Sequence, residues 1–313
     1  MPKHIPPKIP SKPPAPNTAR GILELERFSE ESLTQWHAAA QNLDELEDVL
    51  YFNLEPERRK LRNDLIEALK VNKFKELHLN GWLRIVDYQF SLEPLSCSGS
   101  LRSYGGRFNA GMELDSGNLK PWPALYIAEN LETAFREKFH IKSSDLIDGL
   151  TPNELALQPG NSHSNVSLEG KLFRVFDMTS DQPLIPIAQI LKRIKLPAKA
   201  KELQKRLKIP ASKLFMITTS KQVYDMALNS NWRTLPVQFG LPAKSHILAE
   251  LIRAAGFEAI LYKSTQGPGK CLAVFPDLLD ERSYIEIIGE APRELKHRRL
   301  DSNSSKDLDG WNF

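Results

Sequence analysis

The feature that most constrains the fold is a glycine pair followed by a short, strongly apolar segment. Gly105 and Gly106 precede Arg107, and without a Cβ the backbone there can turn sharply or approach a ligand closely. Residues 124–128 read Ala-Leu-Tyr-Ile-Ala, a run whose length and apolar content predict a buried strand with Tyr126 in its middle. An arginine and a tyrosine are therefore expected on short elements bounded by turns.

A helix and a second strand carry the next polar residues. Asn130 is a good helix cap, and residues 131–139 predict a helix with Glu137 on its second turn. Farther along the chain, the apolar stripe of residues 245–255 predicts a helix that stops at a glycine. The apolar strand that follows ends at Ser264. Such polar residues are poor choices for a core and suit a site that handles a charged substrate with an aromatic group.

Taken in order, these segments resemble the RES domain, a bacterial family named for its arginine, glutamate and serine. Trp82-Leu83-Arg84-Ile85 is similar to the family's opening strand, and the strand-like residues 272–277 fit its ending. The likeness covers roughly residues 80–140 and 245–280. The other matching motifs are Gly105-Gly106-Arg107-Phe108-Asn109, Ala124-Leu125-Tyr126-Ile127-Ala128-Glu129, Glu132-Thr133-Ala134 through Glu137, and Gly256-Phe257-Glu258-Ala259-Ile260 through Ser264.

The resemblance implies both a fold and an activity. The implied fold is an α+β domain like that of ADP-ribosyltransferases, with a mixed or antiparallel sheet split around an NAD⁺ cleft and flanked by helices. Members of the family act as toxins that cleave NAD⁺ at the nicotinamide–ribose bond and pass the ribosyl carbon to inorganic phosphate or to water. NAD⁺ is then the substrate, inorganic phosphate is a co-substrate, and no separate cofactor is expected. The resemblance also implies a paired antitoxin with a helix-turn-helix region, and a homodimer.

The residue roles can be argued from the chemistry of NAD⁺ itself, which carries two phosphates, an aromatic cation and ribose hydroxyls. Arg107 offers a planar fork of donors for a phosphate or carboxamide oxygen, and Tyr126 offers a flat face for nicotinamide. Glu137 accepts a hydrogen bond from a ribose hydroxyl, stabilises positive charge at the anomeric carbon, or activates the incoming phosphate or water. Ser264 fixes the nicotinamide amide or a ribose hydroxyl, and it is not expected to act as a nucleophile because nothing beside it activates it. The expected catalytic residues are Arg107, Tyr126, Glu137 and Ser264, and the expected substrate-binding residues are Arg84, Gly106 and Asn109.

Each of these residues also has an ordinary structural explanation. Arg107 could pair with a surface carboxylate, and Tyr126 could be a core residue with a satisfied hydroxyl. Glu137 lies between two cations, as on an exposed, salt-bridged helix face. Ser264 lies just before Thr-Gln-Gly-Pro-Gly, where a turn serine is expected. Only the combination, in the family's order, favours a site.

Composition limits the class of protein. The chain has 313 residues, of which 41% are hydrophobic and 26% charged, which is ordinary for a soluble globular protein. No apolar run approaches the length of a membrane span, and the first residues lack the apolar core of a secretory signal. Cys97 and Cys271 are too few and too far apart for a disulfide framework or a zinc site. A cytoplasmic protein without a metal or membrane contact is therefore expected.

Charge gives a weaker signal. The net charge of +3 is too small to indicate nucleic-acid binding by the whole chain. Residues 192–208 concentrate lysine and arginine against a single glutamate. This basic run fits either a solvated helix face or a surface for an acidic partner or nucleic acid, and it lacks the interleaved aromatic residues that stack on bases.

The chain divides into four predicted segments. Residues 1–20 form a proline-rich, disordered tail, and residues 21–78 form a helical extension, which is either packing for the catalytic domain or a contact module for a partner. Residues 79–290 form the catalytic domain, with an insertion at about 141–244. Residues 291–313 form a polar C-terminal tail, expected to fray from Leu300 onward.

Several elements are predicted outside the motifs. A helix is expected to start at Ser29, and a loop at residues 111–122 is either a lid or a surface excursion. The remaining predicted elements are a helical repeat through Leu43, Leu46, Val49 and Leu50, another through Leu61, Leu65, Ile66 and Leu69, a strand at 171–178, and helices at 185–193 and 199–207.

Two other functions remain open from the sequence. The first is ADP-ribosyl transfer to a macromolecule, which would leave label from NAD⁺ on protein or nucleic acid. The second is a catalytically silent protein that keeps the fold and binds a partner through residues 29–76 or 192–208.

Overall fold

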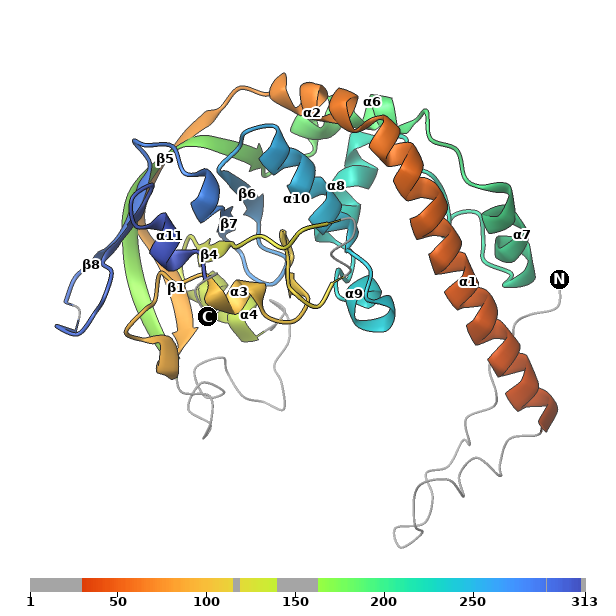
Figure 1. The fold of residues 1–313 in the computed structure, drawn as a ribbon, viewed down its shortest axis with the longest axis horizontal. Helices are drawn as coiled ribbons and strands as arrows, with labels where there is room; N and C mark the ends of the chain where they lie inside the picture. Colours follow the sequence, from red (N-terminus) through yellow and green to blue (C-terminus); the bar gives the residue numbers. More distant parts are fainter. Residues whose placement is uncertain (1–29, 115–118, 140–162, 291, 311–313) are drawn as a thin grey trace, which may run out of the picture. The chain divides into compact units, whose positions relative to one another are not determined.

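The computed structural model describes residues 30–114, 119–139, 163–290 and 292–310 (Figure 1). The expected tail at 1–20, the helix start at Ser29 and the first part of the expected insertion lie outside these residues. The chain separates into two compact units. The helical unit comprises Met1–Leu61 and Leu191–Ile217, and the sheet unit comprises Arg62–Ile190 and Thr218–Phe313.

The helical unit is built on helices α1 (Glu30–Lys60) and α7 (Ala198–Arg206). Leu46 on α1 packs with Ala200 and Leu203 of α7, and partly buried aliphatic side chains of α1 and of the segments flanking α7 surround them. An ion pair of 3.1 Å between Glu45 and Lys199 joins the same two helices. The predicted repeat around Leu46 therefore forms a core, although Leu43 stays 43% exposed.

The sheet unit contains one seven-stranded mixed sheet in the order β1-β4-β7-β6-β5-β8-β9. The long strand β5 also pairs with β1, so that the pairings β1-β4-β7-β6-β5 close back on themselves. Only β5 and β6 run parallel, and β2 and β3 form a separate small hairpin. The strands are β1 (Lys75–Asp87), β2 (Gly105–Gly106), β3 (Asn109–Ala110), β4 (Leu125–Ala128), β5 (His163–Met178), β6 (Ala259–Lys263), β7 (Lys270–Val274), β8 (Tyr284–Ile288) and β9 (Arg299–Asp301).

Helices of the sheet unit surround this sheet. Helix α4 contacts β1 and β4, and α10 packs against α2 and α8. The helices are α2 (Arg62–Lys70), α3 (Ser98–Leu101), α4 (Leu131–Phe139), α6 (Ile185–Leu191), α8 (Ser220–Leu228), α9 (Thr234–Phe239), α10 (Lys244–Ala254) and α11 (Ser305–Leu308), with short 3-10 turns η2 (Tyr88–Phe90), η3 (Gln182–Leu184) and η4 (Pro276–Leu278). The predicted α+β class, with a mixed sheet and an N-terminal helix, is confirmed.

The core of the sheet unit follows the apolar runs of its strands. Fully buried leucine and valine side chains from β4, β5, β6 and β7 form one cluster. Phe257 lies beneath it between Phe74 and Phe176, with edge-to-face ring contacts of 5.1 and 5.0 Å. These contacts stack the end of α10 on the sheet, so the strand that leads to Ser264 starts from a rigid point.

The C-terminal segment differs from its prediction. Fraying from Leu300 onward is wrong for the described residues, because Arg299–Asp301 pairs with β8 and Leu300 is fully buried. The polar residues there bond one another: Asp301 accepts hydrogen bonds from the backbone N–H groups of Asn303 and Ser304. Local turn bonding of this kind makes a folded segment look like a polar tail. Across the described residues, no helix is both long and apolar enough to cross a bilayer.

Candidate functional site

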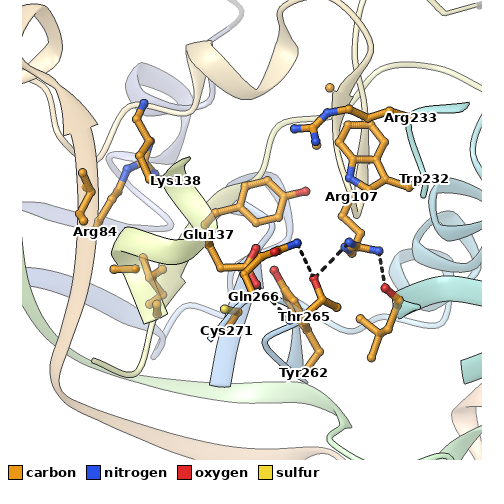
Figure 2. Close-up of a pocket in the computed structure, with 18 of the residues that line it drawn as sticks. Arg84, Arg107, Glu137, Lys138, Trp232, Arg233, Tyr262, Thr265, Gln266 and Cys271 are labelled. Carbon is orange, nitrogen blue, oxygen red and sulfur yellow. Dashed lines mark hydrogen bonds between the residues drawn. The ribbon is translucent and has the colours of Figure 1, made fainter. Parts of the chain in front are cut away.

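One cavity of about 580 Å³ opens in the sheet unit, a volume typical of small-molecule sites (Figure 2). Its wall comes from β1, the β2 turn, β4, α4, the segment after α8, and the β6–β7 hairpin. These elements are far apart in sequence, so the cavity forms only once the sheet is closed. Five of the seven predicted site residues line it: Arg84, Gly106, Arg107, Tyr126 and Glu137.

Glu137 is the only acidic side chain among the described residues that line the cavity. Its oxygen Oε1 accepts a hydrogen bond of 2.6 Å from the Ser264 hydroxyl and one of 3.2 Å from the Thr265 backbone N–H. Both bonds end on the same oxygen and fix the direction of the carboxylate. Charge-assisted bonds of this kind are the stronger class in proteins.

Helix α4 is itself held against the β6–β7 hairpin. The Asn130 side chain accepts from the Thr133 backbone N–H at 2.9 Å, which confirms the predicted cap. The Thr133 hydroxyl in turn accepts from the Gly269 backbone N–H at 2.9 Å. A Cβ on Gly269 would lie 2.7 Å from that hydroxyl, so the close approach requires glycine. The position of Glu137 thus depends on the hairpin that carries Ser264.

Ser264 lies behind the carboxylate and outside the cavity lining. Its hydroxyl also accepts from the backbone N–H groups of Gln266 at 3.0 Å and Gly267 at 2.8 Å. It is therefore a turn serine and a ligand of Glu137 at the same time. The structure brings Arg107, Tyr126, Glu137 and Ser264 into one region and gives Ser264 a contact with the glutamate.

The loop before Arg107 is rigid. Gly105 has φ +88°, in the left-handed region, and a Cβ on Gly106 would lie 2.6 Å from the Tyr126 hydroxyl. That hydroxyl accepts from the Phe108 backbone N–H at 2.9 Å and donates to Asn109 Oδ1 at 2.9 Å. Burial raises the pKa of Tyr126 well above its usual value, so its proton stays in this bond.

Asn109 serves the loop and lies outside the cavity. Its side chain is fully buried, and Oδ1 also accepts from the Gly106 backbone N–H at 2.9 Å. Its amide group donates to the carbonyls of Ser100 and Trp122 at 2.6 and 3.2 Å. The predicted substrate contact is thus replaced by bonds that hold the turn carrying Arg107, because these backbone groups occupy the amide.

Arg107 reaches across to the end of helix α8. Its Nη1 donates to the carbonyls of Ala227 and Leu228 at 3.1 and 2.8 Å, and Nη2 lies 3.4 Å from the Thr265 hydroxyl. A cation at a helix C-terminus stabilises the unsatisfied carbonyls there. The guanidinium is consequently fixed at the cavity wall, with α8 on one side and the β6–β7 hairpin on the other.

His246 supports the same loop from helix α10. Its Nε2 lies 2.8 Å from the Gly106 carbonyl, and Nδ1 lies 3.2 Å from the Ala243 backbone N–H. Because Nδ1 must accept from an N–H group, Nε2 carries the proton and donates. Burial lowers the pKa of His246 to about 4, so the ring is neutral near pH 7.

Three further cations line the cavity. Arg84 donates through Nη2 to the Ser96 carbonyl at 2.8 Å, whereas its buried Nη1 has no hydrogen-bond partner among the described residues. Burial lowers the pKa of Arg84. Lys138 pairs with Asp87 at 2.7 Å, and the Arg233 guanidinium lies 4.9 Å from the centre of the Trp232 ring. Four cations against one carboxylate give the cavity a positive character suited to an anion.

Sequence reasoning missed part of this wall. Trp232 and Arg233 lie within the expected insertion at 141–244, which carried no motif, yet they line the cavity. The run Asn-Ser-Asn-Trp-Arg at 229–233, with a tryptophan among turn-forming residues after a helix, was the available signal. Tyr262, Cys271 and Gln266 also line the cavity, and burial raises the pKa of the Cys271 thiol, so it is not a ready nucleophile.

Comparisons with known proteins identify a family. A sequence model described as the RES domain matches residues 82–294, more than half of the chain. A crystal structure of the M. tuberculosis MbcT–MbcA toxin–antitoxin complex is similar over 78% of this chain and 96% of that chain, at 10% identity and a TM-score of 0.40. No curated protein sequence matches the chain.

Proposed function

The chain belongs to the RES domain family, and from that membership we propose that its cavity binds NAD⁺ and cleaves the nicotinamide–ribose bond. The observation that carries the proposal is the fixed Glu137 carboxylate in a cavity otherwise lined by cations. NAD⁺ matches this arrangement, since its diphosphate is anionic and its nicotinamide riboside has a cationic ring. In this proposal the fold is related to that of ADP-ribosyltransferases.

The proposed reaction breaks the bond between the ribose anomeric carbon and the ring nitrogen, and the electron pair leaves with nicotinamide. Positive charge then develops on the ribose ring, as in glycoside hydrolysis, and the Glu137 carboxylate stabilises it. The Ser264 and Thr265 donors on Oε1 hold the carboxylate in place. We assign catalysis to Glu137 and Arg107, and positioning to Ser264 and Tyr126.

The acceptor attacks the same carbon. With inorganic phosphate the products are nicotinamide and ADP-ribose 1″-phosphate, and with water they are nicotinamide, ADP-ribose and a proton. Arg84 and Lys138, on the opposite side of Glu137 from Arg107 in Figure 2, supply positive charge for a phosphate acceptor. The buried, unpartnered Nη1 of Arg84 supports this, since a buried donor without a partner is costly unless a ligand completes it.

The proposal includes the biological setting that the family resemblance implies. The enzyme acts as a toxin, and a paired protein with a helix-turn-helix region holds it silent. We further propose a cytoplasmic location, a homodimer, and a catalytic segment of residues 79–290.

The test is to incubate the purified full chain with NAD⁺, with and without phosphate, and to follow nicotinamide release by chromatography. Glu137→Gln is expected to slow release by about 10²–10⁴-fold, the usual contribution of a carboxylate in this kind of catalysis. The matched control is Glu132→Gln on the same helix, whose exposed side chain pairs with Arg136.

Other outcomes point to the two alternative functions. Absence of release by wild-type protein, or unchanged release by Glu137→Gln, contradicts NAD⁺ cleavage. Label from NAD⁺ on protein or nucleic acid identifies ADP-ribosyl transfer. Tight binding of a partner without any turnover identifies a catalytically silent protein.

A further inference from the structure

The segment after helix α8 brings an arginine and a tryptophan to one end of the cavity. Figure 2 shows Arg233 and Trp232 on the same side of the cavity as Arg107, with Glu137 between them and the opposite end. The charges of this end interact: beyond partial burial, the neighbouring Arg107 lowers the pKa of Arg233, and Glu137 opposes the effect. Two cations held within electrostatic reach of each other favour an anion between them.

Arg233 is oriented by Trp232. The guanidinium lies over the indole ring, 4.9 Å from its centre, in a cation–π contact. The ring of Trp232 in turn lies 5.5 Å from the ring of His246. A guanidinium fixed in this way loses less rotational freedom when it binds a ligand than a free arginine does.

His246 connects the two arginine-bearing segments. One nitrogen of its ring bonds the carbonyl of Gly106, the residue before Arg107, while the ring lies beside that of Trp232, the residue before Arg233, tilted by 56°. The same buried side chain therefore sets the positions of both arginines. The fold therefore holds the Arg107 and Arg233 segments next to each other through His246.

We propose that Arg233, held on Trp232, determines specificity by binding the adenosine diphosphate half of the substrate together with Arg107. This rests on the proposed function and deepens it. The planar guanidinium of the exposed Arg233 matches the oxygens of a diphosphate and can stack on an adenine ring, and Arg107, held by the Ala227 and Leu228 carbonyls, adds positive charge beside it. Nicotinamide riboside lacks this half and gains nothing from Arg233.

Two measurements on the full chain test the inference. The first is the affinity for ADP, by titration calorimetry, which does not depend on catalysis. Arg233→Ala is expected to weaken ADP binding by about 10- to 100-fold, the usual effect of losing a charge-assisted hydrogen bond. The second is cleavage of NAD⁺ and of nicotinamide riboside, which has the same scissile bond and no phosphate. Arg233→Ala should raise KM for NAD⁺ by a similar factor and leave kcat/KM for the riboside within about twofold.

The controls separate positioning from folding. Arg282→Ala removes an exposed arginine that also stacks on an aromatic ring, that of Phe173, outside the cavity, and it should change neither measurement. Trp232→Ala should weaken ADP binding, and Trp232→Phe should restore most of it because phenylalanine keeps a face for the guanidinium. Thermal melts confirm that each variant is folded.

The outcomes are distinct. If Arg233→Ala binds ADP as tightly as wild type, or if wild type does not bind ADP, the inference is overturned whether or not NAD⁺ is cleaved. If ADP binding depends on Arg233 while wild type leaves NAD⁺ intact, the proposed role of Arg233 is supported and the proposed NAD⁺ cleavage fails. An equal loss of cleavage for NAD⁺ and nicotinamide riboside also overturns the inference.

Discussion

Two glutamates of the sheet unit, Glu137 and Glu258, are each bonded to a serine, but their surroundings differ sharply. Glu258 is fully buried and accepts four hydrogen bonds, from the backbone N–H groups of Phe173, Arg174 and Asp280 and from the Ser283 hydroxyl. Glu137 lines the cavity and accepts two, both on one oxygen. Glu258 joins β5, the start of β6 and the turn before β8.

The source of the hydrogen bonds distinguishes a structural carboxylate from a functional one. A carboxylate whose bonds all come from the surrounding chain is part of the scaffold, since no acceptor capacity faces solvent or a ligand. A carboxylate held from one side and open on the other can act on a bound molecule. Changing Glu258 should therefore affect stability, whereas changing Glu137 should affect activity.

The largest effect on stability is expected from Glu258→Gln. The amide keeps the shape but turns an N–H donor toward backbone donors that need an acceptor, which should lower the free energy of unfolding by about 3 kcal/mol or more. Urea denaturation measures it, with the exposed Glu281→Gln as the control expected to stay within about 0.5 kcal/mol. Equal stabilities for the two variants would contradict the structural role assigned to Glu258.

The pH dependence of stability tests the buried support under the site. The folded-state pKa of His246 is about 4, below the ordinary value of 6.5, because burial disfavours the charged ring. The unfolded chain therefore binds the proton first as pH falls. The neutral ring stabilises fully above about pH 6.5, and about 3 kcal/mol of this contribution is lost on going down to pH 4.

His246→Gln, which does not titrate, isolates this contribution. Urea denaturation at pH 7 and at pH 4 should show a smaller loss of stability in the variant than in wild type, by about 3 kcal/mol. The stability lost when carboxylates are protonated between pH 7 and pH 4 is the same in both proteins and cancels in the difference. Equal losses in the two proteins would show that His246 is not held neutral against the Gly106 carbonyl.

The smallest expected effects come from Ser264 and Ser283, the serines bonded to the two glutamates. Ser264→Ala removes the 2.6 Å bond to Glu137 and should lower kcat by about 10- to 100-fold with little change in KM, since Ser264 lies outside the cavity lining. Ser283→Ala removes the 2.8 Å bond to Glu258 and should cost about 1.5–3 kcal/mol of stability with kcat unchanged. Reversed results for the two variants would show that the roles of the glutamates are misassigned.

The sequence predicted one wall of the site better than the other. Helix α4 has the predicted bounds of 131–139, and the Asn130 cap and the apolar strand before Ser264 have clear local signals. Those signals depend on neighbours in the chain. The wall with Trp232 and Arg233 arises from tertiary packing of a segment without hydrophobic periodicity, so no local sequence pattern predicts it.

Residue type alone also failed to give side-chain direction. Asn109 is polar and follows Arg107, yet it points into the protein because the Gly106 N–H and two carbonyls require its amide. A buried polar group must be paired, and the partners of Asn109 were not visible in the sequence. The segment after Leu300 is folded for the same reason, since its polar residues form hydrogen bonds with one another.

The most direct test of the account is a crystal structure of Glu137→Gln with NAD⁺ bound. We expect the anomeric carbon of the nicotinamide ribose beside residue 137, and the diphosphate against Arg107 and Arg233. NAD⁺ bound elsewhere on the protein, or a cavity that stays empty at saturating NAD⁺, would contradict the account.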